Sequence, residues 1–156
     1  MKTGIIVYSQ TGNTLSVAEK LKEKLAAAGH SAEIEQVTIA GGRKSGDRAF
    51  QLETRPDVAQ YDALIFGSAV EAFSLSAVLA TYLRGIGSLE GKKVACLVTQ
   101  SFPYPWMGGN RAIRQMRRIC ESKGATVRGS AIVNWAKCRR AKTTAQAIEG
   151  LTRALA

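Results

Sequence analysis

The chain has 156 residues, of which 46% are hydrophobic and 22% are charged, and this is the composition of an ordinary globular domain with one hydrophobic core. We therefore expect a single domain over residues 1–156, and the lack of a run of roughly 18 apolar residues argues against a membrane-spanning protein. The formal net charge is +10, and the excess is uneven, because residues 1–70 carry eight basic and eight acidic side chains whereas residues 71–156 carry fourteen and four.

The first half of the chain shows a strand, a helix and a second strand. Residues 5–8 are continuously apolar, which is typical of a buried strand. A helix is predicted from Leu15 to Ala28, because apolar residues recur there at helical spacing until Gly29 ends the pattern. Polar and apolar residues alternate over 32–39, as in an edge strand. Residues 40–61 show no regular pattern, and we predict a loop that serves as a lid, an interface or a simple connection.

The second half continues this alternation, with strands predicted at 63–68, 94–98 and 127–133, and helices at about 75–83, 111–120 and 143–155. Continuously apolar strands separated by helices indicate a parallel sheet that is covered on both faces. The sequence therefore predicts an α/β fold, a three-layer doubly wound sandwich with a five-stranded parallel sheet. Ligands of such folds bind beyond the carboxyl ends of the strands, so the loops after the first, third and fourth strands are candidates.

The loop after the first strand, YSQTGNT, is rich in small hydrogen-bonding groups. It carries the hydroxyls of Ser9, Thr11 and Thr14, and Gly12 allows its backbone to approach a ligand closely. The first backbone N–H groups of the following helix have no intrahelical acceptor, and the helix dipole adds partial positive charge. These features together predict a phosphate-binding turn made of neutral dipoles.

Other kinds of site are absent from the sequence. It contains no G-x-x-x-x-G-K-[ST] loop, no dinucleotide-binding glycine pattern and no G-x-S-x-G elbow. None of the three cysteines is followed six residues later by arginine, as a small cysteine phosphatase would need. The cysteines are widely spaced and only one histidine is present, so we expect free thiols, no metal site and no catalytic residue.

The segment Ser9-Gln10-Thr11-Gly12-Asn13-Thr14 resembles the [ST]-x-T-G-x-T loop of flavodoxins and related FMN-binding proteins. This resemblance implies a flavodoxin-like sheet with strand order 2-1-3-4-5 and FMN as cofactor, its phosphate held by this loop. It also implies that the loops after strands three and four embrace the isoalloxazine. The segment GSAVEAFSLS, residues 67–76, is similar to the corresponding loop of flavodoxin-like quinone reductases. Flavodoxins are usually acidic, whereas this chain is basic, and SFPYPWMGG takes the place of their acidic, tyrosine-containing loop.

A flat, electron-poor ring binds best between aromatic or apolar faces, with backbone donors along its edge. Trp106 is the favoured stacking residue, followed by Tyr104 and Phe102, while Gly108 and Gly109 would let the backbone approach the ring. The complete set of residues expected to bind FMN is Ser9, Gln10, Thr11, Gly12, Asn13, Thr14, Ser68, Ala69, Val70, Phe73, Thr99, Gln100, Ser101, Phe102, Tyr104, Trp106, Gly108 and Gly109.

The expected function is that of a cytoplasmic FMN-binding redox protein, either an electron carrier or an NAD(P)H-dependent flavin or quinone oxidoreductase. Arg111, Arg114 and Arg118 form one helical stripe that could dock an acidic protein such as a ferredoxin, or the phosphate of NADPH. Neither a membrane nor a nucleic acid is an expected partner. The alternative is a flavodoxin-fold binding module without redox activity, whose basic C-terminal half contacts an acidic protein or another anionic partner.

Overall fold

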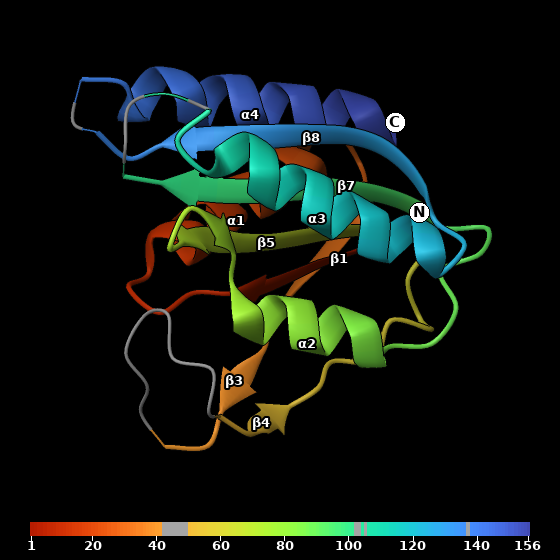
Figure 1. Cartoon of the computed structure of the whole chain (residues 1–156). Coiled ribbons are helices and arrows are strands. Elements are labelled where there is room, and N and C mark those ends of the chain that lie inside the picture. Colours follow the sequence, from red (N-terminus) through yellow and green to blue (C-terminus); the bar gives the residue numbers. More distant parts are fainter. Residues whose placement is uncertain (42–49, 102–103, 105, 137) are drawn as a thin grey trace.

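Five long parallel strands form the middle layer of the structure, a computed structural model that describes residues 1–41, 50–101, 104, 106–136 and 138–156 (Figure 1). These strands are β1 (Lys2–Tyr8), β2 (Ser31–Gln36), β5 (Ala63–Glu71), β7 (Lys93–Gln100) and β8 (Thr126–Asn134). They lie side by side in the order β2-β1-β5-β7-β8, and all four neighbouring pairs are parallel. The predicted order 2-1-3-4-5 is therefore confirmed.

Two pairs of helices cover the sheet and complete the three-layer sandwich (Figure 1). Helices α1 (Asn13–Ala27) and α4 (Arg140–Leu155) pack on one face, and α2 (Ala77–Gly85) and α3 (Gly109–Ser122) pack on the other. Because side chains alternate along a strand, Ile5 and Val7 enter the core under α1 and α4, whereas Ile6 enters the core under α2 and α3. The apolar run of β1 is thus explained by burial on both faces.

The loop predicted over residues 40–61 is only partly correct. Strand β2 ends at Gln36, and the short strand β3 (Thr38–Ile39) pairs with β4 (Leu52–Thr54) in a separate antiparallel ribbon. The Thr54 hydroxyl accepts the Thr38 N–H at 2.8 Å and donates to the Gln36 carbonyl at 2.8 Å. Such pairing joins residues far apart in the sequence, and a local hydropathy pattern does not reveal it. Residues 42–49 lie outside the described part.

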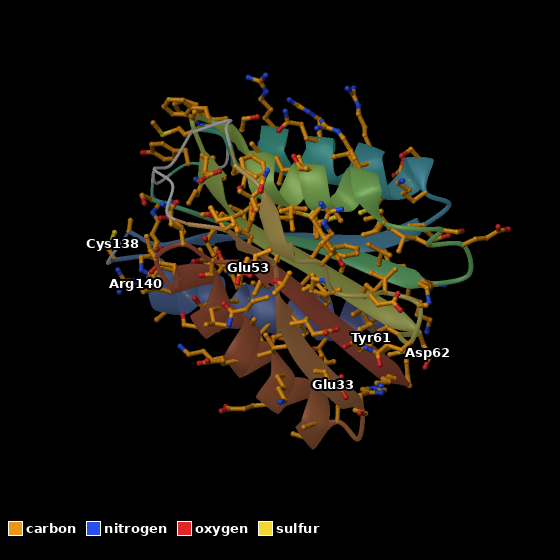
Figure 2. The ribbon with its side chains drawn as sticks, turned by 90° about the horizontal axis from the view of Figure 1, so that it is seen from below. Glu33, Glu53, Tyr61, Asp62, Cys138 and Arg140 are labelled. Atoms are coloured by element: carbon orange, nitrogen blue, oxygen red, sulfur yellow. The ribbon has the colours of Figure 1, made fainter. Side chains whose placement is uncertain are left out.

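Tyr61 closes the amino-terminal edge of the sheet. Its side chain is 1% exposed, and its hydroxyl lies 3.1 Å from a carboxylate oxygen of Glu33 and also contacts Glu35. Burial, followed by these hydrogen bonds, raises the pKa of Tyr61, so the phenol stays neutral. Figure 2 shows Tyr61 and Glu33 together at one end of the molecule. The ring lies directly against Gly4 of β1, where a Cβ atom would stand 2.7 Å from it.

All three cysteines are free, as predicted. Cys96 on β7 and Cys120 on α3 are buried, and Cys138 is exposed. A hydrogen bond with Cys120 and burial raise the pKa of the Cys96 thiol, so Cys96 stays protonated in the core. Within the described residues, none of the helices combines the length and the apolar character that crossing a bilayer requires.

Candidate cofactor site

A cavity of about 220 Å³ opens at the carboxyl edge of the sheet, where β1, β5 and β7 end. Its walls come from the three loops that the sequence analysis selected, together with the start of α1. The lining residues are Tyr8, Ser9, Gln10, Thr11, Asn13, Thr14, Ala69, Val70, Glu71, Ser76, Thr99, Gln100 and Ser101. The structure therefore gathers most of the predicted residues around one hollow, although their binding role stays a prediction.

The first loop turns sharply into α1 at Gly12. This residue has a φ of 89°, a left-handed conformation that glycine adopts without steric cost, and it occupies the N-cap position. No side chain of the described residues caps the helix at that position. The Ser9 hydroxyl instead accepts the N–H of Leu15 at 3.2 Å, while the N–H groups of Asn13 and Thr14 have no intrahelical acceptor. The start of α1 is thus suited to an anionic ligand.

Thr14 and Thr99 join the first loop to β7 through their hydroxyls. The two oxygens are 2.9 Å apart, and both residues are 1% exposed. One hydroxyl donates to the other, so the pair keeps one hydrogen for a further acceptor. Gly67 lies beside them, where a Cβ atom would stand 3.2 Å from the Thr14 methyl group. Because Gly67 has no side chain, Thr14 can pack closely against β5.

Replacing Thr99 with valine is expected to lower the free energy of unfolding by about 1 kcal/mol, because the buried Thr14 hydroxyl loses its partner while the shape is retained. Thermal unfolding of the ligand-free protein measures this as a decrease of roughly 2–4 °C in Tm. The matched control is Thr152→Val, which removes a helical hydrogen bond to Ile148 on the partly exposed face of α4. Equal Tm values for Thr99→Val and the unmodified chain would contradict the role of the hydroxyl pair.

Three lining residues, Tyr8, Glu71 and Ser76, were not predicted. Ser76 is completely buried, and its hydroxyl has no hydrogen-bond partner among the described residues, so it is available to a ligand in the cavity. Glu71 is 8% exposed and adds a carboxylate to the wall. Ser76 occupies the N-cap position of α2, whereas the sequence predicts it inside the helix, so the pattern does not mark it as a lining residue.

Glu71 and Ser76 reach the cavity because the chain folds back after β5. Strand β6 (Ser74–Leu75) pairs with Val70 and Glu71 in an antiparallel hairpin, whereas the sequence predicted Leu75 in a helix. Ala72 and Phe73 form its tip with φ values of 49° and 59°. Two consecutive residues with positive φ make the turn that suits a two-residue hairpin, at a cost of roughly 1–2 kcal/mol for each non-glycine residue. Phe73 is 51% exposed at this tip and does not line the cavity.

Tyr104 and Trp106 lie outside the lining of the cavity; the segment after β7 that contains them is called the aromatic loop below. Tyr104 and Trp106 are 45% and 71% exposed, and their rings stack with centroids 5.5 Å apart and planes inclined by 5°. The guanidinium of Arg139 lies 5.5 Å from the centre of the Tyr104 ring. Stacking of Trp106 on a bound ring stays a prediction. Phe102 lies outside the described residues.

Gly108 and Gly109 connect the aromatic loop to the neighbouring loops. Gly108 has a φ of 112°, and a Cβ atom there would stand 2.8 Å from the Phe73 backbone. At Gly109, which is buried, a Cβ atom would stand 2.3 Å from the Gln100 amide oxygen. The two glycines therefore permit close packing between loops. Their predicted contact with a cofactor remains untested.

Ser68 and Gln100 differ in their relation to the cavity. Ser68 is fully buried, its hydroxyl donates to the Ala69 carbonyl at 3.2 Å, and it lies outside the lining. The Gln100 amide donates to the Tyr104 carbonyl at 2.7 Å while its side chain also lines the cavity. Gln100 thus couples the cavity wall to the aromatic loop.

Helix α3 starts near this edge, runs away from it and carries a row of exposed arginines. Arg111, Arg114 and Arg118 are exposed and make no ion pair with another described residue, whereas Arg117 pairs with Glu121 at 3.1 Å. Arg140, at the start of α4, stacks on Trp135 with 4.6 Å between the guanidinium and the ring centre. Figure 2 shows Arg140 and Cys138 at one end of the molecule and Tyr61 at the opposite end. Arg140 and Cys138 follow the carboxyl end of β8.

Comparison with known proteins gives one family and a set of similar folds. The sequence model of the family described as flavodoxin matches residues 5–149. No curated protein sequence matches the chain. Oxidised flavodoxin 2 from Bacillus cereus is similar, with a TM-score of 0.74 and 21% identity over 99% of this chain and 97% of that one.

Two further solved structures carry other descriptions. A flavoprotein from Lactobacillus acidophilus in complex with FMN gives a TM-score of 0.62 and 20% identity, covering 84% of this chain and 92% of that one. The Trp repressor binding protein from Bacillus subtilis gives a TM-score of 0.63 and 16% identity, covering 99% of this chain and 100% of that one. At these identities the likeness establishes a shared fold.

Proposed function

Because the chain belongs to the flavodoxin family, we propose that it is a redox protein that binds FMN non-covalently at the cavity beyond β1, β5 and β7. The observation that carries this proposal is the convergence of three loops with neutral donors at the start of α1. FMN supplies the one- and two-electron chemistry when it is bound, while the chain binds and orients it.

The part of the lining at the start of α1 fits the phosphate end of FMN. Ser9, Thr11 and Asn13 surround the start of α1, where hydroxyl and amide groups can donate to phosphate oxygens. The Ser76 hydroxyl, which has no hydrogen-bond partner in the described part of the chain, supplies a further polar group. The cavity of about 220 Å³ is smaller than the roughly 300 Å³ at which whole-ligand sites begin, so it suits the phosphate and its polyol chain. The ring would then lie against the loops after β5 and β7.

Titration of the purified protein with FMN tests this proposal. Binding is expected to change the flavin fluorescence saturably, with one FMN per chain, and to give a yellow protein after gel filtration. Unchanged fluorescence and a colourless protein would overturn it and favour a flavodoxin-fold binding module without redox activity.

We further propose that an acidic redox protein, such as a ferredoxin, docks on the exposed arginine stripe of α3. Helix α3 begins beside the cavity, and Arg111 and Arg114 lie in its first half. Opposite charges steer association and set the orientation of the partners. We also propose a cytoplasmic location, because the three thiols of the chain are free.

Charge reversal at Arg111→Glu and Arg114→Glu together is expected to slow reduction by a reduced ferredoxin roughly 10-fold at low salt, since steering falls with screening. The difference should shrink at high salt. Stopped-flow absorbance of the FMN-loaded protein measures the rate. The matched control is Lys22→Glu with Lys24→Glu, which changes the net charge equally on exposed positions of α1. Equal slowing in both variants would contradict a docking role for α3.

NAD(P)H is the alternative electron donor, and anaerobic mixing distinguishes the two. Rapid bleaching of the flavin by NADH or NADPH would assign the chain as an NAD(P)H-dependent reductase. Reduction by ferredoxin without such bleaching would assign it as an electron carrier.

A further inference from the structure

A second cavity, of about 590 Å³, lies at the C-terminal end of α2. One wall is β4 with the segment that follows it, and the other is the last turn of α2 with the residues after it. In Figure 1 this segment leaves β4 and runs near α2. The volume falls within the roughly 300–1,000 Å³ that small-molecule sites occupy. We refer to this cavity as the α2-end pocket.

The α2-end pocket is separate from the cofactor cavity. Ser76, at the N-cap of α2, lines the first cavity, and Gly85, the last residue of α2, lines the second. The helix between them has nine residues, so its ends are about 13 Å apart. A ligand in one cavity is therefore not a part of the other site.

Apolar groups form the interior of the α2-end pocket. Val58 and Tyr82 are 5% and 2% exposed, and the partly buried Leu52 and Ile86 complete the apolar wall. The Tyr82 hydroxyl donates to the Pro56 carbonyl, so the polar end of this side chain is already satisfied and its ring contributes apolar surface. This wall suits a hydrocarbon or aromatic body.

Two cations stand at the rim. Arg55 and Arg84 both line the pocket and are exposed, and neither side chain forms a hydrogen bond or ion pair with another described residue. The carboxylate of Asp57 also lines the pocket, but it accepts the Ala59 N–H at 3.0 Å in a local turn. The two guanidiniums therefore outnumber the single carboxylate, and guanidiniums bind carboxylates through paired hydrogen bonds.

Gly85 and Gly87 line the pocket and have free space beside them. A Cβ atom at Gly85 or at Gly87 would meet no heavy atom within 4 Å. Neither residue has a positive φ, so a side chain at either position would extend into open space without backbone strain. These positions offer a way to fill the pocket from its rim.

We propose that the α2-end pocket binds a small organic carboxylate with an apolar body. Arg55 and Arg84 bind the carboxylate, and the apolar body lies against Val58, Tyr82 and Ile86. This site is independent of the proposed FMN site, and each can be tested without the other.

Octanoate is the probe, and two-dimensional NMR of the ¹⁵N-labelled full chain is the measurement. Saturable shifts are expected at the backbone amides of Gly85 and Gly87. Octanol lacks the charge and inorganic phosphate lacks the apolar body, so each is expected to bind at least 10-fold more weakly. Equal binding of octanol would overturn the role of the arginines, and equal shifts with phosphate would overturn the role of the apolar wall. No saturable shift with millimolar octanoate would overturn the proposal.

Two variants test the assignment. Arg84→Gln is expected to weaken octanoate binding about 10-fold, and Gly87→Leu is expected to weaken it as well, because the leucine adds bulk to the lining. Arg128→Gln, on an exposed position of β8, is the matched control and should bind as the unmodified chain does. Octanoate affinity that is unchanged in both Arg84→Gln and Gly87→Leu would overturn the site. FMN affinity, measured on every variant, is expected to stay unchanged, which separates this result from that of the cofactor proposal.

Discussion

Replacing Thr11 with aspartate is expected to weaken FMN binding by roughly 30- to 150-fold, which corresponds to about 2–3 kcal/mol. Thr11 lines the cofactor cavity at the start of α1 and is exposed, so the variant places a carboxylate near the proposed phosphate without burying a charge in the core. The carboxylate and the phosphate are both negatively charged, so they repel each other. Fluorescence titration with FMN at low and high salt measures the loss, and screening should reduce it.

The matched control is Ser88→Asp. Ser88 is exposed at the opposite edge of the sheet, and its hydroxyl accepts the Glu90 N–H at 3.1 Å, a bond that an aspartate can also accept. This variant introduces the same charge and should bind FMN as the unmodified chain does. Thr11→Asp with unchanged affinity would remove the first loop from the proposed site.

Replacing Gly4 with alanine is expected to destabilise the fold by about 2–3 kcal/mol, and to lower Tm by roughly 5–10 °C. Gly4 is buried in β1, between β2 and β5, and the new methyl group would stand 2.7 Å from the Tyr61 ring. Tyr61 cannot easily move, because it is 1% exposed and its hydroxyl is held by Glu33 and Glu35. Thermal and chemical unfolding measure the effect.

Two further variants make this result specific. Gly150→Ala lies in α4, where a Cβ atom meets open space, and it should raise stability by about 0.5–1 kcal/mol because alanine favours the helix. Tyr61→Leu removes the ring, so adding Gly4→Ala to it should cost less than Gly4→Ala costs alone. Strictly additive effects in the double variant would show that the methyl group and the ring do not clash.

The central sheet could be predicted because its strands are encoded locally. The central strands β1, β5 and β7 are buried on both faces and read as apolar runs. The edge strand β2 alternates between polar and apolar residues, and the helices between the strands carry a helical repeat. The β3–β4 ribbon was not predicted, because it depends on hydrogen bonds of Thr54 with Thr38 and Gln36, which are distant in the sequence. Its two strands are also too short for a periodic pattern.

The cofactor cavity was predicted where loop chemistry is local and missed where the chain reverses. Ser9, Thr11 and Asn13 follow the first strand directly, and all three line the cavity. Glu71 and Ser76 reach it through the β5–β6 hairpin, whose tip is Ala72 and Phe73. Neither tip residue is an asparagine or a glycine, the types that are typical of such a turn, so no local pattern indicates it.

The glycine N-caps of α1 and α3 have a consequence for the energetics of the ligand-free chain. Gly12 and Gly108 have no side chain that could cap their helices. At the start of α1 the Ser9 hydroxyl accepts the Leu15 N–H, and the N–H groups of Asn13 and Thr14 are left for a ligand. A bound anion would satisfy these amides and, by mass action, would add about 2.7 kcal/mol of stability at a free concentration of 100 times Kd. Amide hydrogen exchange should therefore be fast in the first turn of α1 without ligand, and should slow there when the cavity is filled.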